Sequence, residues 1–204
     1  MPGRTQPRGA RRRDALLDAT ARLLDARGYD GVNTNAIAAE AGVAVGTVYH
    51  HFPDKQALLG ALLERYGARL FATVAATVAA AQGRPLDDLV DAGVRAFAAF
   101  YLREPGYAQL WLSAQLTGPL REAGEQWGAR FGDEFGALFS ETLGLPKARA
   151  REVALAFVHA VSAVVTVAVA RPDKRARASM IREAVRVGQG YLRAVHSPRP
   201  RSRR

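Results

Sequence analysis

The chain has 204 residues, which is enough for one compact domain or two small ones with a buried core. It contains no cysteine, which excludes disulfides, thiolate metal sites and thiol nucleophiles. The net charge of +10 lies in the two ends: residues 1–13 and 193–204 carry five arginines each and no acidic residue, and the charges of residues 14–192 balance. Such ends bind polyanions weakly or stay solvated. Without an apolar signal segment, we expect a cytoplasmic protein.

The spacing of apolar residues predicts helices along nearly the whole chain. A first helix ends near Gly28, a second runs from an Asn33 cap to Gly42, and a third covers 45–51. Pro53-Asp54 begins a long fourth helix. Glycine and proline then delimit five more, over 86–103, 107–116, 117–144, 147–171 and 174–195. The expected fold is therefore all-α, with nine helices.

Residues 33–55 have the apolar spacing of a helix-turn-helix. Ala38 is small where two helices cross closely, and Gly42 suits a helix end that needs positive φ. Val43 and Val48 pack the second helix of the motif against the first, above Ile37. Such a unit presents its second helix to the DNA major groove.

The motif continues into the sequence TVYHHFPDK at 47–55, which closely resembles the end of the DNA-binding domain in the tetracycline repressor (TetR) family. The resemblance implies a three-helix DNA-binding domain and a larger helical bundle that binds an effector and dimerises. We therefore expect a basic disordered arm over 1–10, a DNA-binding domain over 11–56, an effector and dimerisation domain over 57–196, and a basic disordered tail over 197–204.

The resemblance also implies which residues touch DNA. Thr47, Tyr49, His51 and Lys55 would contact phosphates, to which hydroxyls and cations donate well. The remaining members of the predicted set would face base edges (Val45, Gly46 and His50) or the backbone at the arm and the start of the second helix (Arg12, Arg13, Asn33, Thr34 and Asn35).

The motif departs from the family pattern in two ways that affect binding. Ala44 stands where the family usually has serine, so the third helix lacks a side-chain cap, at a cost of about 1 kcal/mol. Val45 and Gly46 carry no hydrogen-bonding side chain, so thymine methyl contacts, His50 and DNA shape must supply more of the specificity. Residues 14–55 also carry a net charge of −3, and we expect the arginines at 4–13 to supply the missing attraction.

The resemblance implies an effector pocket in the second half of the chain. Aromatic residues beside glycines and alanines favour a cavity between helices there, and the scarcity of interior charge favours an apolar or aromatic effector. The residues predicted to line it are Phe100, Tyr101, Tyr107, Trp111, Trp127, Phe131 and His159.

We expect a homodimer held by the last two helices in a four-helix bundle, reading an inverted repeat in double-stranded DNA. The interface residues predicted for this dimer are Val161, Val165, Val169, Ile181, Val185 and Tyr191.

Three alternative classes of protein stay open at this stage. The first is a DNA-binding dimer without an effector, controlled by a protein partner. The second is an enzyme, although the four histidines show no metal-ligand spacing and no glycine-rich phosphate loop follows a strand, so no cofactor is expected. The third is a membrane-tethered regulator, because residues 153–170 are uncharged; arginines flank this segment and polar residues interrupt it, which favours a buried helix instead.

Overall fold

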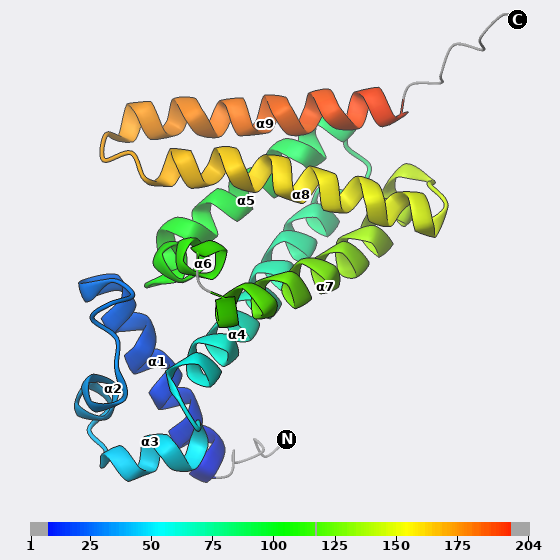
Figure 1. Ribbon diagram of the computed structural model, residues 1–204. Helices are drawn as coiled ribbons and strands as arrows, with labels where there is room; N and C mark the ends of the chain where they lie inside the picture. The colour runs from blue at the N-terminus through cyan, green and yellow to red at the C-terminus, as the bar shows by residue number, and fades with distance from the viewer. Residues whose placement is uncertain (1–7, 117, 197–204) are drawn as a thin grey trace, which may run out of the picture. The chain divides into compact units, whose positions relative to one another are not determined.

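The computed structural model describes the backbone of residues 8–116 and 118–196, and their side chains except at 8, 112–129 and 131 (Figure 1). Within these residues the chain forms nine α-helices and no strand, which confirms the predicted all-α fold. The helices are α1 Arg8–Arg27, α2 Thr34–Ala41, α3 Val45–His51, α4 Lys55–Ala80, α5 Leu86–Arg103, α6 Tyr107–Leu116, α7 Gly118–Leu143, α8 Lys147–Val169 and α9 Lys174–His196.

Several helix ends lie where capping residues predict them. The side-chain oxygen of Asn33 accepts a hydrogen bond of 2.9 Å from the Ala36 N–H at the start of α2. Asp54 does the same for Ala57 at the start of α4, at 2.7 Å. Gly28 and Gly42 end α1 and α2 with φ of 67° and 65°, a conformation that costs glycine little.

Three predicted boundaries differ from the structure. α1 already begins at Arg8, so residues 8–10 of the predicted disordered arm are helical, because alanine and arginine favour a helix. α8 ends at Val169 instead of 171, and α9 continues to His196. The rest of the arm, residues 1–7, and the tail at 197–204 lie outside the described residues.

The chain divides into two compact units, and the first combines residues 1–67 with 104–126. In it α6 packs on α1. The Asp25 carboxylate accepts a bond of 3.1 Å from the Gly106 N–H, and the Tyr66 hydroxyl donates to the Pro105 carbonyl at 2.5 Å. These contacts group α6 with α1, α2 and α3, whereas the sequence predicts a domain boundary at 56.

The second unit combines residues 68–103 with 127–204. α8 runs beside α9, and both pack against α5 (Figure 1). A Cβ on Gly188 would lie 2.9 Å from a ring carbon of Phe157, so glycine lets α9 approach α8 closely. Arg193 of α9 forms an ion pair with Asp87 of α5 and lowers the pKa of that carboxyl. These contacts hold the end of α9 against the start of α5.

Candidate nucleic-acid interface and effector cavity

The turn between α2 and α3 has the geometry of a helix-turn-helix. The N–H of Gly42 donates to Ala39, and that of Val43 donates to the Ala38 carbonyl at 3.0 Å, which closes the end of α2. The side chains of Ile37 and Val48, one from each helix, are fully buried. The inner face of α3 is therefore fixed against α2, and its outer face is free to meet a ligand.

The outer face of α3, which we call the recognition face, contains Val45, Gly46, Thr47, Tyr49 and His50. Tyr49 is the most informative member, because a large aromatic side chain that is 54% exposed does not contribute to the core. Gly46 and His50 are also exposed, and Val45 and Thr47 are half-buried. The structure thus brings these predicted DNA-binding residues onto one surface.

The start of α2 supports this surface. The Thr34 and Tyr49 hydroxyls lie 3.2 Å apart and form a hydrogen bond between α2 and α3, which orients the tyrosine ring. Asn33 uses its side-chain oxygen for the helix cap, and Asn35 is exposed. α3 itself begins at Ala44 without a side-chain cap, as the sequence predicts.

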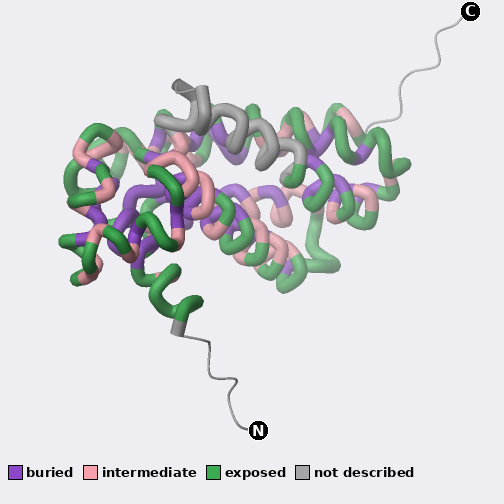
Figure 2. The backbone as a smooth tube through the Cα atoms, turned by 60° about the horizontal axis from the view of Figure 1, so that its bottom comes forward, coloured by how far each residue is buried: buried purple, intermediate pink, exposed green. Residues whose placement is uncertain are grey.

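Four cationic or titratable side chains gather where α1 and α3 meet, and we call them the basic cluster: Arg12, Arg13, His50 and His51. The guanidinium of Arg13 lies 5.0 Å from the centre of the Phe52 ring, and the two histidine rings lie edge to face at 5.1 Å. Burial lowers the pKa of His51, and positive charge on His50, Arg12 and Arg13 lowers it further. The start of α1 is exposed (Figure 2), so the cluster can meet an anion such as a DNA phosphate.

Lys55 has a more constrained position than the sequence indicates. Its ammonium donates to the Tyr29 carbonyl at 2.7 Å and lies 3.9 Å from the centre of the Tyr29 ring. Gln56 donates to the hydroxyl of the same tyrosine at 3.0 Å. Lys55 therefore also joins α4 to the loop after α1, and only its remaining donors are available for a phosphate.

The acidic residues of this region are mostly engaged in internal contacts. Glu40 accepts from Arg22 at 2.6 Å and Asp18 accepts from Arg65 at 2.7 Å. Asp25 and Asp54 accept from backbone N–H groups. The net charge of −3 for residues 14–55 therefore does not describe the recognition face, which carries no acidic residue and lies next to the basic cluster.

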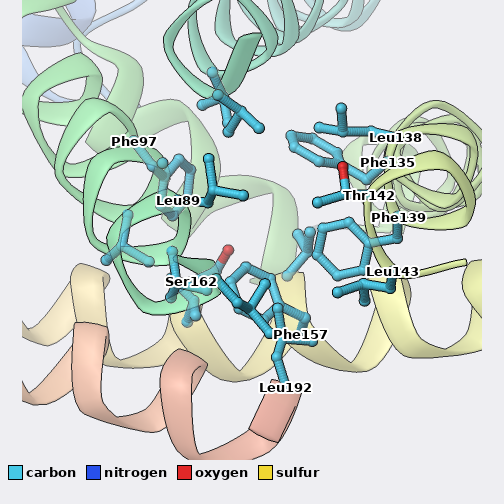
Figure 3. Close-up of a pocket in the computed structure, with 18 residues that line it drawn as sticks. Leu89, Phe97, Phe135, Leu138, Phe139, Thr142, Leu143, Phe157, Ser162 and Leu192 are labelled. Atoms are coloured by element: carbon cyan, nitrogen blue, oxygen red, sulfur yellow. The ribbon is translucent and has the colours of Figure 1, made fainter. Parts of the chain in front are cut away.

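The second unit contains a cavity between five of its helices, α4, α5, α7, α8 and α9 (Figure 3). The centres of water-sized molecules can occupy about 80 Å³ of it. One water needs about 10–15 Å³ on this measure, so the space suits a small organic molecule. Four phenylalanines, one serine, one threonine and twelve valine, leucine or glycine residues line it, none of them charged; the phenylalanines are Phe97, Phe135, Phe139 and Phe157.

The effector residues predicted from sequence do not line this cavity. Phe100 and Tyr101 are buried beyond the end of α5 that borders it, and His159 is exposed on α8. Tyr107 and Trp111 belong to the first unit, because α6 packs on α1. The side chains of Trp127 and Phe131 lie outside the described residues. The sequence did hold a signal for the lining residues, since Phe135 and Phe139 are four apart and share one face of α7.

The predicted dimer residues also need correction. Val161, Val165 and Val185 are 3%, 0% and 5% exposed, so they belong to the core of the second unit and cannot meet a partner. Val169, Ile181 and Tyr191 are half-buried. The exposed apolar positions of these two helices are different ones and include Leu155, Ala156, Ala160, Ala163 and Val167 on α8 and Val187, Gly190 and Ala194 on α9.

α8 is the one helix, within the part of the chain that the structure describes, that is long and apolar enough to cross a membrane. Core helices of soluble proteins meet the same criterion. One side of α8 packs against α5 and α9, and Val153, Ala154 and Val165 on that side are fully buried. Packing therefore accounts for the apolar residues on that side, and the exposed side carries the apolar residues given above.

Two family models match the chain. Residues 16–62 match "Bacterial regulatory proteins, tetR family", and residues 85–192 match "Tetracyclin repressor-like, C-terminal domain". The first match covers the helix-turn-helix, and the second covers more than half of the chain, including most of the cavity lining.

Individual proteins that the chain resembles are also transcriptional regulators. The chain is 31% identical over 146 residues to the HTH-type transcriptional regulator BetI of Burkholderia mallei, covering 70% of this chain and 74% of that protein. It is 46% identical to the HTH-type transcriptional repressor KstR of Rhodococcus jostii over 59 residues, which is only 28% of that repressor's length. A TetR-family transcriptional regulator from Streptomyces coelicolor has the same fold, with a TM-score of 0.72 and 27% identity over 90% of this chain and 99% of that one.

Proposed function

Because this chain belongs to the tetR family, whose members are DNA-binding transcriptional regulators and not enzymes, we propose that it is a homodimeric repressor that a small effector releases from DNA. The recognition face carries the DNA-binding part of this proposal. An exposed tyrosine and a row of small residues lie on α3, which is buried only on its inner side, and the basic cluster of α1 and α3 lies next to them.

The proposed contacts divide into two kinds. Tyr49, Thr47 and the basic cluster donate to phosphates, which positions the protein on any sequence. Val45, Gly46 and His50 meet base edges and supply the sequence preference. Because Gly46 has no side chain, the backbone of α3 can approach the floor of the groove closely.

The proposed dimer uses the exposed apolar side of α8 and α9. Large side chains there, Leu155, Val167 and Val187, are 37%, 49% and 39% exposed, which is unusual for three such residues on adjacent helices. Alanine and glycine between them let helices of two copies pack closely. Two copies related by a two-fold axis would form a four-helix bundle and read an inverted repeat.

The proposed effector site is the cavity of the second unit. An apolar cavity between helices, lined by four phenylalanines, favours a small molecule over control by a protein partner, which would need an extended surface groove instead. The proposed function requires binding to genomic DNA, so we place the protein in the cytoplasm.

Selection of double-stranded DNA from a random pool by the purified full chain tests the proposal. The expected product is an inverted repeat whose half-site centres are about 34–36 Å apart, or a multiple of that distance. A Tyr49→Phe variant should select the same repeat and bind it more weakly, since it loses a phosphate contact and the hydrogen bond to Thr34 but no base contact. Enrichment of a single unrepeated site, or of nothing above background, would contradict the proposal.

A further inference from the structure

We propose that the cavity binds an uncharged ring hydrocarbon carrying one hydroxyl or carbonyl oxygen, and that Ser162 is the residue that recognises this oxygen. The inference rests on the effector site proposed above and defines the chemistry of its ligand. Three observations carry it: the composition of the lining, the state of the Ser162 hydroxyl, and the arrangement of the aromatic rings.

The lining excludes an ionic ligand. Of its eighteen residues, sixteen are valine, leucine, phenylalanine or glycine, and the other two, Ser162 and Thr142, are neutral hydroxyl residues. An ion transferred from water into such a site would lose its hydration without gaining a charged partner, which is strongly unfavourable. The ligand must therefore be uncharged and mostly hydrocarbon.

Ser162 is the polar group that the interior of the cavity offers. It is only 7% exposed, and its hydroxyl points from α8 into the space between the lining side chains (Figure 3). Thr142 also lines the cavity, but it is exposed and can be solvated from outside. A ligand oxygen inside the cavity would thus meet the hydroxyl of Ser162.

The Ser162 hydroxyl has no hydrogen-bond partner among the residues that the structure describes. Three threonines of this chain show one way in which a helical hydroxyl is satisfied: Thr20, Thr73 and Thr77 each donate to the carbonyl four residues earlier, at 2.7–2.8 Å. Ser162 does not make this bond. The Ser162 hydroxyl is open to the cavity and is surrounded there by apolar side chains, so a ligand oxygen that pairs with it would be stabilised selectively.

Water alone does not account for this site. A buried water typically makes two to four hydrogen bonds, and Ser162 supplies one partner inside an otherwise apolar wall. The available 80 Å³ is several times what one water needs, so most waters in the cavity would face apolar side chains and find no hydrogen-bond partner in the wall. An apolar molecule with one oxygen can pack against the apolar lining and form a hydrogen bond with the Ser162 hydroxyl.

The aromatic side chains favour a ring over a flexible chain. Phe139 of α7 and Phe157 of α8 meet edge to face, with ring centres 5.3 Å apart, and both border the cavity. Phe97 and Phe135 line it from α5 and α7. Rings arranged in this way can add a further edge-to-face or offset contact to a planar ligand.

Isothermal titration of the full-length protein with 4-ethylphenol and ethylbenzene tests the inference. The two probes share a ring and an alkyl group and differ by one hydroxyl, and both are uncharged at pH 7. We expect the wild-type protein to bind 4-ethylphenol about three- to tenfold more tightly, the range that one net hydrogen bond supplies. Ser162→Ala should abolish this preference and leave the affinity for ethylbenzene unchanged.

Two further variants test whether the preference for 4-ethylphenol comes from Ser162 and whether both probes bind in the cavity. Thr142→Val removes the other hydroxyl of the lining and should keep the preference. Gly93→Ala should fold, because its Cβ would lie 3.5 Å from a methyl of Val78, an ordinary contact, and it should weaken both probes together by filling space. A preference that survives Ser162→Ala, or that Thr142→Val removes, would overturn the role of Ser162.

The possible failures separate the inference from the proposed function. If both probes bind the wild-type protein equally and Gly93→Ala weakens both, the effector cavity is supported and the inference about its ligand is wrong. If neither probe binds, the ligand class is wrong, whereas DNA selection still tests the repressor on its own. Binding of a charged probe such as 4-ethylbenzoate more tightly than 4-ethylphenol would also overturn the inference.

Discussion

At the scale of single residues, the basic cluster couples DNA binding to protonation of the His51 imidazole. Burial lowers the pKa of His51 below its ordinary value of 6.5, and the nearby positive charge of His50, Arg12 and Arg13 lowers it further. A phosphate placed at this cluster supplies negative charge and favours the protonated imidazole, which raises the pKa again. Binding therefore takes up a proton between the pKa of the free protein and that of the complex.

We predict that affinity for DNA increases as the pH falls from 8 towards the lowered pKa of His51, and becomes constant below it. Fluorescence anisotropy on one selected operator, at fixed salt, measures this dependence. His51→Gln should flatten the dependence on pH by keeping a polar but untitratable side chain. An unchanged slope in His51→Gln would show that the proton is bound elsewhere.

Lys55 has two roles at once, and they are separable by experiment. Lys55→Ala removes the contact with Tyr29 and should lower the free energy of unfolding by about 1 kcal/mol. It should also reduce the slope of log affinity against log salt by about one unit per DNA-binding unit, because a phosphate contact is lost. Gln56→Ala is the matched control, since it loses a bond to the same tyrosine without changing charge. If the two variants have the same salt slope, Lys55 does not contact a phosphate.

At the scale of helices, the α5–α6 turn fixes α6 to α1. Gly106 has a φ of 68°, and a Cβ at this position would lie 2.6 Å from both the Ala21 carbonyl oxygen and the Leu24 Cβ. Its N–H also donates to Asp25. No other residue type fits this contact without moving the helices apart.

Gly106→Ala should therefore lower the free energy of unfolding by about 2–4 kcal/mol, combining backbone strain with overpacking. Urea denaturation measures this change. Gly60→Ala provides the control, because Gly60 lies within α4 with nothing within 4 Å of its added Cβ, and it should be neutral or stabilising by up to about 1 kcal/mol. Equal stability of the two variants would show that α6 is not held by this close contact.

At the scale of the whole molecule, the exposed apolar side of α8 and α9 predicts the dimer. Ala163 is exposed on this side, so Ala163→Arg should leave each copy folded and place an unpaired charge in the interface. Light scattering should then show a monomer. Affinity for the operator should fall at least tenfold, because each DNA-binding unit then binds its half-site without the second unit of a dimer. Ala72→Arg, at an exposed position of α4, should remain dimeric. A dimeric Ala163→Arg protein would place the interface elsewhere.

The sequence by itself determined the helices, most of their ends and the family. These depend on local chemistry: Asn33 caps α2 with its own side chain, Gly42 adopts positive φ, and the motif at 47–55 is continuous in the chain. The same locality made Ala44 recognisable as a missing cap. None of these features requires a partner that is distant in the sequence.

Only the tertiary structure decided which side of a uniformly apolar helix faces inward. On α8, Val161 and Ala160 are adjacent and both apolar, yet the first is in the core and the second is exposed, because α5 and α9 cover only one side. For the same reason, the cavity is lined by other residues than the predicted aromatic ones, and Ser162 is among them. Charge behaved likewise, since counting acids along 14–55 could not show that Glu40 and Asp18 are paired with arginines. Hydrophobicity and charge are properties of residues, but burial and pairing depend on which other helices lie beside them.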